Sequence, residues 1–290
     1  MGLFFMFLKD SVEKILSATI VDSQAVSGGC VSEAYLVTTS KQQNYVVKLD
    51  QSRCGMLMVE ADGLQQLKQT DTFYIPTVIS VDEHLLILEA IAVTNPQKYF
   101  WQIFGEKLAA LHQFTGEHWG LSYDNYIGMT PQLNSTKENS WSDFFVNQRI
   151  APQFKWLKEK GLATGRLSEI YNDLIKTIIA HLTRRVPSKS LLHGDLWSGN
   201  YLVSPNNSPV LIDPAIYYGD REAEFSMMLL FGGFPAEMFD AYQNTWPMDE
   251  GWEQRRSIYK LYHLMNHANL FGQSYIAQVQ QCTDQIIRLS

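Results

Sequence analysis

The sequence changes its hydrophobic period near residue 90, and this change constrains the fold more than any other feature. Up to that point, short stretches with the alternation typical of strands lie between turn-forming residues and enclose one helical segment. From Pro96 onward, apolar residues recur at helical spacing. The pattern predicts an α+β chain with an antiparallel sheet and one inserted helix over residues 1–90 and a mainly helical part over residues 91–290.

The expected elements follow from these periods. In the first part we expect a short helix at 9–20, strands at 34–39, 45–49, 78–81 and 85–88, and the inserted helix at 58–68. In the second part we expect helices at 99–112, 141–158 and 167–183, with several more from residue 222 onward. Only the stretches 201–203 and 210–212 are predicted as strands there.

Composition and the chain start exclude several classes of protein. The formal net charge of −7 argues against a nucleic-acid backbone as the main partner. The three cysteines, Cys30, Cys54 and Cys282, lack CxxC spacing, so neither a zinc site nor a disulfide framework is indicated. The apolar start MGLFFMFLKD is too short for a signal peptide or a membrane span, and Met6 is an alternative first residue. We therefore expect a cytoplasmic protein.

The stretch LLHGDLWSGN carries the most specific chemical signal. Its Gly-Asp and Ser-Gly-Asn pairs are ordinary turn formers, but HGDxxxxN followed by a strand-terminal Asp213 predicts a catalytic loop. Asp195 would accept the proton of an attacking hydroxyl group, and the gain would come mainly from its position. Asn200 and Asp213 offer the hard oxygen ligands that Mg²⁺ prefers. We expect His193 to brace the loop.

Four weaker signals precede this loop in a meaningful order. Lys48, within a strand, would neutralise nucleotide phosphates, and Glu60 on the next helix would hold its side chain. Backbone N–H groups at Gly28 and Gly29 could approach phosphate oxygens, although a Gly-Gly pair is more often a plain turn. This order of parts is typical of protein-kinase-like phosphotransferases, so we predict a bilobal fold that uses ATP and Mg²⁺.

Longer segments carry a family resemblance. Together with HGDLWSGN and IDPA, the stretches GLSYDNYIGMTPQLNS and WSDFFVNQRIAPQ closely resemble the fructosamine kinase family, also called ketosamine 3-kinases. The likeness covers nearly the whole chain. It implies ATP-dependent phosphorylation of the sugar O3′ in ketosamines, after which the adduct falls apart and the amine is restored, which is a protein-repair reaction. It also implies ribulosamines or erythrulosamines as acceptors, with fructosamines as a further possibility.

The resemblance also implies roles for individual residues. It assigns Lys48 and Glu60 to phosphate positioning, Asp195 to proton acceptance, and Asn200 and Asp213 to the metal. The segment Glu89-Ala90-Ile91 matches the hinge whose backbone would hold adenine. Trp197 either packs against the sugar or only packs the loop. Five further residues either line the acceptor cleft or are structural: Asp124, Asn125, Gln132, His267 and Asn269.

Several alternatives stay open from the sequence. Asp220 and Glu224 look like bracing groups after the metal loop. Cys30 is either a redox-sensitive thiol at the glycine turn or simply a small residue. The chain could also be a kinase of another hydroxylated amine, such as an aminoglycoside or choline, or a regulatory pseudokinase. Retention of the residues with predicted chemical roles argues against the pseudokinase. The expected partner is a small ketosamine or a glycated protein lysine, with the chain a monomer or a homodimer.

Overall fold

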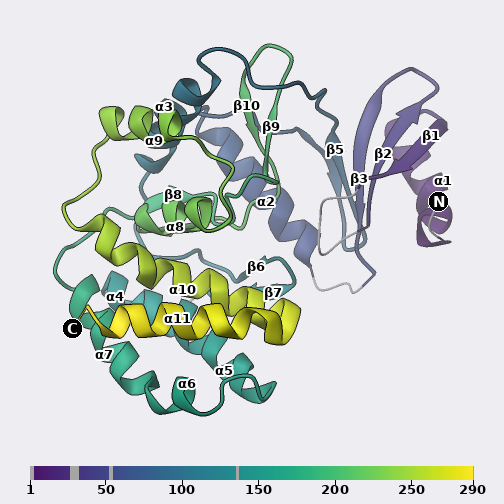
Figure 1. Ribbon diagram of the computed structural model, residues 1–290. Helices are drawn as coiled ribbons and strands as arrows, with labels where there is room; N and C mark the ends of the chain where they lie inside the picture. Colours follow the sequence, from purple (N-terminus) through teal and green to yellow (C-terminus); the bar gives the residue numbers. More distant parts are fainter. Residues whose placement is uncertain (1–2, 27–32, 52–54, 135–136, 290) are drawn as a thin grey trace. The chain divides into compact units, whose positions relative to one another are not determined.

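The computed structural model describes residues 3–26, 33–51, 55–134 and 137–289 (Figure 1). It forms two compact units, which we describe separately. Unit 1 comprises Met1–Phe100 and Gly199–Pro214, and unit 2 comprises Trp101–Ser198 and Ala215–Ser290. The sequence-based division at residue 90 differs from these units in two respects, because unit 1 continues to Phe100 and also takes in residues 199–214.

Unit 1 is built on a five-stranded antiparallel sheet with strand order β1-β2-β3-β5-β4. Its elements are α1 (Leu3–Leu16), β1 (Ile20–Ala25), β2 (Glu33–Thr39), β3 (Asn44–Leu49), α2 (Met56–Gln69), β4 (Val78–Val81) and β5 (Leu85–Glu89). The α+β class, with an antiparallel sheet in the N-terminal part, is thereby confirmed.

The two faces of strand β3 face different neighbours. Val47 and Leu49 belong to the buried cluster that also contains Val12 and Leu16 of α1. Because successive side chains of a strand point to opposite faces, Lys48 points to the other face, where it is cross-strand to Leu86 of β5. Helix α2 packs near β4 and β5. The strand period therefore places a lysine toward the helix that carries Glu60.

A two-stranded hairpin from late in the chain completes unit 1. Strands β9 (Tyr201–Val203) and β10 (Pro209–Leu211) pair antiparallel. The backbone of Tyr74 bonds to β10 on both sides, accepting from the Leu211 N–H at 3.1 Å and donating to the Pro209 carbonyl at 3.4 Å. The Thr94 N–H donates to the Val203 carbonyl at 2.9 Å. These non-local bonds explain why the hairpin belongs to unit 1.

Unit 2 is mainly helical. Its helices are α3 (Phe100–His112), α4 (Trp141–Phe145), the π-helix η1 (Val146–Ile150), α5 (Ala151–Glu159), α6 (Arg166–Glu169), α7 (Tyr171–Leu182), α8 (Glu222–Phe231), α9 (Ala236–Thr245), α10 (Trp252–Phe271), the 3₁₀-helix η2 (Gly272–Tyr275) and α11 (Ile276–Ile287). Two short hairpins accompany them: β6 (Asn125–Ile127) with β7 (Thr130–Gln132), and β8 (Ser190–Leu192) with β11 (Tyr217–Gly219).

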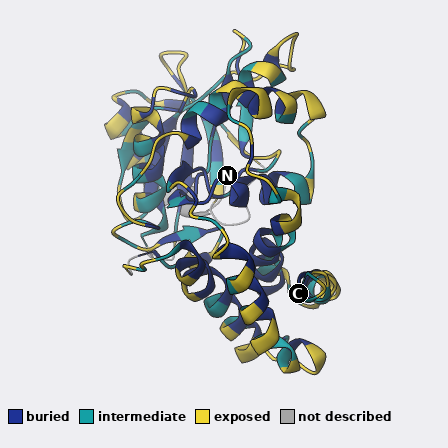
Figure 2. Ribbon diagram, turned by 90° about the vertical axis from the view of Figure 1, so that its left-hand side faces the viewer, coloured by how far each residue is buried: buried dark blue, intermediate teal, exposed yellow. Residues whose placement is uncertain are grey.

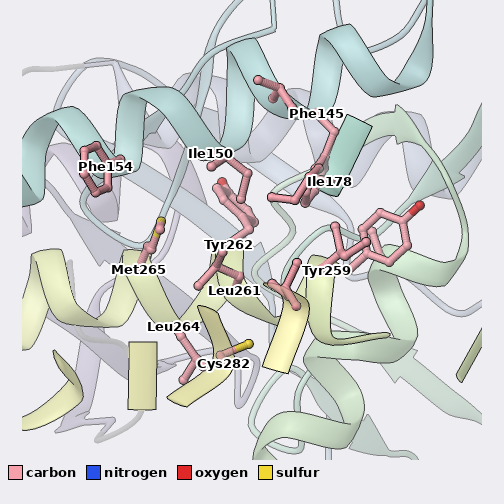
Figure 3. Packing of buried hydrophobic residues seen from close by; sticks show 14 of the residues in the cluster. Phe145, Ile150, Phe154, Ile178, Tyr259, Leu261, Tyr262, Leu264, Met265 and Cys282 are labelled. Carbon is pink, nitrogen blue, oxygen red and sulfur yellow. The ribbon is translucent and has the colours of Figure 1, made fainter. Parts of the chain in front are cut away.

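Helix α10 lies at the centre of the unit 2 core. It packs against α5, α8 and α11, and 11 of its 20 residues are buried. Figure 2 shows buried residues where helices face one another and exposed residues on their outer sides. Tyr259, Leu261 and Met265 of α10 lie in one cluster with Ile150 and Cys282 from neighbouring helices (Figure 3). The cysteine is thus a packing residue, and burial raises its thiol pKa to about 11. In the described residues, no helix is long and apolar enough to cross a membrane.

Several expected elements differ from the structure. The first helix ends at Leu16 and is followed by strand β1, which was not predicted. The single helix expected at 141–158 contains a π turn at Val146–Ile150 just before Pro152, which has no N–H to continue the regular bonding. The prediction of only two strands after residue 96 was wrong, because β6, β7, β8 and β11 are also present. Each of these has three residues, which is too short to show a period.

Candidate active site

Three charged residues of unit 1 meet around the ammonium group of Lys48. Its Nζ lies 2.6 Å from Glu60 Oε1 and 2.6 Å from Asp213 Oδ1. Glu60 comes from the second turn of α2, and Asp213 follows β10, far away in sequence. The structure therefore shows the expected contact between Lys48 and Glu60 and adds Asp213 to it.

The environment of this charged triad keeps the lysine protonated. Burial acts against the ammonium charge, but Asp213 and Glu60 outweigh it and hold the pKa of Lys48 above its ordinary value. Burial raises the pKa of Glu60, with Lys48 opposing that shift and Asp213 reinforcing it. The Asp213 side chain is the most accessible of the three, at 31% exposed against 18% for Glu60 and 9% for Lys48. The triad thus presents a fixed cation beside an accessible carboxylate.

Asn200 and Asp213 lie at the two ends of the β9–β10 hairpin. The Ile212 N–H donates to the Asn200 carbonyl at 3.1 Å, which ties the two ends together. Asn200 is 5% exposed, and Asp213 takes a left-handed backbone conformation with φ of 55°. An amide and a carboxylate supply the oxygen donors that Mg²⁺ prefers. Among the described residues, no group of three or more His, Cys, Asp or Glu side chains forms a metal cluster.

The predicted catalytic loop lies in unit 2, directly after β8. Leu191 and Leu192 of β8 pair with Tyr218 and Tyr217 of β11. His193 is the next residue after this strand, so the pairing fixes where the loop begins. Gly194 has a φ of 85°, and a Cβ there would overlap the Ala215 carbonyl oxygen. A glycine is therefore required between His193 and Asp195.

A buried carboxylate holds this loop by its backbone. Glu224 of α8, 2% exposed, accepts hydrogen bonds from the His193 N–H at 2.6 Å and the Gly194 N–H at 3.1 Å. The Asp195 N–H points at His193 Nδ1, 3.3 Å away, so the imidazole ring braces the loop as expected. The expectation of a bracing role is likewise confirmed for Glu224. Asp195 itself is half-buried.

A buried polar network holds the segment that follows Pro214. Gln132 donates to the Ala215 carbonyl at 2.9 Å, and Asn125 donates to the Ile216 carbonyl at 2.9 Å. Gln132 accepts from the Tyr262 hydroxyl at 2.9 Å. Asn125 and Gln132 are 4% and 1% exposed, so the structure gives them structural positions. These amides position the chain beside the catalytic loop, since the Ala215 N–H donates to the His193 carbonyl.

The remaining predicted residues divide into several groups. Asp124 accepts from the Asn134 N–H, Asn269 donates to Gln153, and Asp220 pairs with Arg185 and Tyr259, so all three have structural partners. Trp197 is half-buried in unit 2. His267 lies in an aromatic cluster on α10, described below. Gly28, Gly29 and Cys30 lie outside the described residues.

The expected adenine hinge begins at the last residue of β5. The Glu89 carboxylate accepts from the Tyr74 hydroxyl at 2.5 Å and from the Thr77 N–H and hydroxyl at 3.1 and 2.9 Å. Partial burial acts to raise its pKa, but these hydrogen bonds hold the pKa of Glu89 below its ordinary value. Ala90 and Ile91 follow as half-buried residues outside any strand. The Glu89 side chain thus fixes the start of this segment.

One residue near the loop was missed by the sequence analysis. Tyr262 of α10 is buried, and burial, with a smaller contribution from the Asp195 carboxylate, raises its pKa to about 12. Tyr262 therefore lies within electrostatic reach of the predicted base. A signal was present in YKLYHLMNHANLF, where His, Tyr and Asn occupy positions that become buried in a long helix.

Comparison with known proteins gives consistent results. The family model for fructosamine kinase matches residues 7–289. A protein of Synechocystis named "Probable ketoamine kinase" is 38% identical over 278 residues, which is 93% of this chain and 92% of that protein. The crystal structure of "Putative fructosamine-3-kinase" from Haemophilus somnus superposes with a TM-score of 0.88 at 29% identity, covering 98% of this chain and 99% of that one.

A more distant likeness defines the fold. A thermostable mutant of an aminoglycoside phosphotransferase, in a ternary complex with AMP-PNP and hygromycin B, superposes with a TM-score of 0.68 at 15% identity. The match covers 97% of this chain and 98% of that chain. At this identity the likeness concerns the fold alone, and it confirms the predicted protein-kinase-like fold.

Proposed function

This chain belongs to the fructosamine kinase family, and we propose that it transfers the γ-phosphoryl group of ATP to the O3′ hydroxyl of a ketosamine. The acceptor is either a free ketosamine, with ribulosamine or erythrulosamine preferred to fructosamine, or a glycated lysine side chain. Phosphate at O3′ is a good leaving group once a proton is lost from C1, and its elimination leaves an imine at C1. Water hydrolyses this imine, which restores the amine and releases a 3-deoxy dicarbonyl sugar. The reaction is then one of deglycation.

The charged triad of unit 1 carries this proposal. A lysine held by two carboxylates at 2.6 Å is a rigid cation suited to the α- and β-phosphates of a nucleotide. Asn200 and Asp213 would hold Mg²⁺, which neutralises phosphate charge when it is bound. Only two protein ligands are needed, because Mg²⁺ in such sites takes its other ligands from phosphates and water. The backbone of Glu89, Ala90 and Ile91 would hold adenine.

Unit 2 supplies the acceptor side of the proposed reaction. Asp195 would orient the O3′ hydroxyl and accept its proton. The loop around it is fixed before any substrate binds, because Glu224 and His193 already bond to its backbone. Such preorganisation favours alignment of the attacking oxygen. We further propose that Trp197 contacts the sugar and that the chain acts in the cytoplasm as a monomer or a homodimer.

The test is ATP consumption with magnesium against ribulosyl-lysine, fructosyl-lysine, a glycated peptide, an aminoglycoside and choline. We expect selective turnover of a ketosamine, with a fall of about 10²- to 10⁴-fold in kcat for Asp195→Asn. Asp173→Asn, at an exposed carboxylate of α7 in the same unit, is the matched control and should retain wild-type activity. Turnover of the aminoglycoside or choline alone, or of no acceptor despite ATP binding, contradicts the proposal.

A further inference from the structure

Four aromatic rings form an exposed cluster on unit 2 that has no place in the chemistry above. It consists of Phe231, at the end of α8, His267 and Phe271 of α10, and Tyr275 of η2. We call it the aromatic cluster. His267 is its centre, with ring centroids 4.6 Å from Phe231, 5.6 Å from Phe271 and 5.2 Å from Tyr275. The rings of Phe271 and Tyr275 are 5.9 Å apart.

Two of the large rings of the cluster stay in contact with solvent. Phe231 is 38% exposed and Phe271 is 47% exposed, whereas most of α10 is buried. His267 is uncharged near neutral pH, because burial lowers its pKa and the hydrogen bond with the His263 carbonyl only partly opposes this. The rings of the cluster therefore carry no positive charge of their own, and adjoining aromatic faces attract organic cations.

Two connections within unit 2 place the cluster beside the catalytic loop. First, Phe231 is followed by Gly232 and Gly233, and Gly233 packs so closely on Ser198 that a Cβ there would overlap the serine side chain. Ser198 lies three residues after Asp195. The end of α8 is thus in contact with the loop that carries the predicted base.

Second, helix α10 carries both Tyr262 and two residues of the aromatic cluster. Tyr262 lies within electrostatic reach of Asp195, and His267 and Phe271 follow on the same helix. At 1.5 Å per residue, Tyr262 is roughly 8 Å from His267 and roughly 14 Å from Phe271 along the axis. On helix α10 the cluster therefore begins between one and two turns beyond Tyr262, the residue that is influenced by the charge of Asp195.

We propose that the aromatic cluster is the subsite for the protonated amine of the acceptor and the first part of the alkyl group attached to it. This inference rests on the proposed function, which it deepens by assigning the recognition of the amine. In a ketosamine the amine nitrogen is separated from O3′ by three carbon atoms, and its substituent extends further away. With O3′ at Asp195, the cation and its alkyl chain reach toward the rings, whose faces attract a cation and whose edges pack against methylene groups.

The test compares two acceptors that differ only in charge: a 1-alkylamino-1-deoxyribulose, which is cationic, and the 1-O-alkyl ribulose ether, which is neutral. The variants are Phe231→Leu and Phe271→Leu, at exposed positions where the core is not disturbed. We expect each to raise KM for the amine about three- to tenfold, to change KM for the ether less than twofold, and to leave kcat and KM for ATP unchanged. Phe114→Leu, at another exposed phenylalanine of unit 2, should change none of these values.

The outcomes separate the subsite from the proposed function. Equal increases in KM for amine and ether would show that the rings contribute only apolar surface, and unchanged KM for both would show that they do not contact the acceptor. Either result overturns the inference and leaves ketosamine phosphorylation intact. If the wild-type protein phosphorylates neither ribulose derivative nor any ketosamine, the proposed function fails, and the subsite fails with it.

Discussion

The two units hold their functional residues by opposite means. In unit 1, Lys48 is fixed by ion pairs with Glu60 and Asp213, and the side chain of Asp213 is 31% exposed. In unit 2, the catalytic loop is fixed through its backbone by Glu224, and the segment after Pro214 is fixed by Asn125 and Gln132. These three supporting side chains are at most 4% exposed.

The difference fits the roles that we propose for the two units. In unit 1 the lysine is buried, but the carboxylates that hold it are 18% and 31% exposed, so water can solvate them when the lysine is lost. A loop that positions a base needs fixed N–H and C=O groups, and these are buried where no water can replace a missing partner. Substitutions in the charged triad should therefore reduce activity at little cost in stability, whereas substitutions of the buried supports should reduce both.

Among the substitutions that test this comparison, Lys48→Met should have the largest effect. We expect kcat/KM to fall about 10²- to 10³-fold, because the cation that we propose to face the phosphates is lost. The free energy of unfolding should change by less than about 1 kcal/mol, since Asp213 is accessible to water and Glu60 can take up a proton. Lys155→Met, which removes an exposed pair with Glu159, is the control for loss of a charge. Urea unfolding that shows a loss of several kcal/mol for Lys48→Met would break the comparison.

A second prediction concerns the support in unit 2. Glu224→Ala leaves two buried N–H groups without their acceptor, and we expect the free energy of unfolding to fall by about 3 kcal/mol. The kcat of the folded protein should fall as well, with KM for ATP unchanged, because the loop loses its position. Glu224→Gln keeps one carbonyl oxygen and should recover part of both losses.

The control for this substitution is Glu237→Ala, at an exposed carboxylate in the first turn of α9. It should be neutral in both measurements. A Glu224→Ala protein that is less stable but has wild-type kcat when folded would show that the carboxylate is only structural. That result would contradict the prediction that Glu224 positions the catalytic loop.

The sequence predicts the charged triad of unit 1 better than it predicts the buried side chains that support the loop and the following segment in unit 2. Lys48, Glu60 and Asp213 each carry a local signal, namely a strand, a helix start and a strand end, and the structure brings them together. The π turn and strand β1 were missed, since no local residue pattern distinguishes them. The fold class could be predicted because strand periods before residue 90 and helical periods after it together extend over the whole chain.

The supports were harder to predict because their contacts are non-local. Glu224 was expected to brace the site, but the sequence does not show that its partners are the N–H groups of His193 and Gly194, 31 and 30 residues earlier. Asn125 and Gln132 looked equally suited to an open acceptor cleft and to a buried network. Only their contacts with Ala215 and Ile216 decide between the two. Side-chain chemistry is readable from a sequence, whereas burial of a polar group depends on the packed fold.

The smallest effect we predict concerns the pH dependence of stability in unit 2. His263 of α10 is 2% exposed, its Nδ1 finds no hydrogen-bond partner among the described residues, and burial, with smaller contributions from His267 and Arg149, lowers its pKa to about 3. In the unfolded chain a histidine has a pKa of about 6.5. Between these values only the unfolded state takes up the proton, so stability is complete above pH 6.5 and falls as the pH falls toward 3.

His263→Leu removes this proton uptake. From pH 7 to pH 5.5 the wild-type protein should lose about 1 kcal/mol more stability than the variant, measured as the free energy of unfolding in urea. Burial also lowers the pKa of His112, so the free energy of unfolding of both proteins should still depend on pH through His112. His118→Leu, at an exposed histidine, should retain the wild-type slope. Equal slopes for wild type and His263→Leu would mean that this buried ring does not couple unit 2 to pH, and the contrast between the units would then rest on Glu224 and the amides alone.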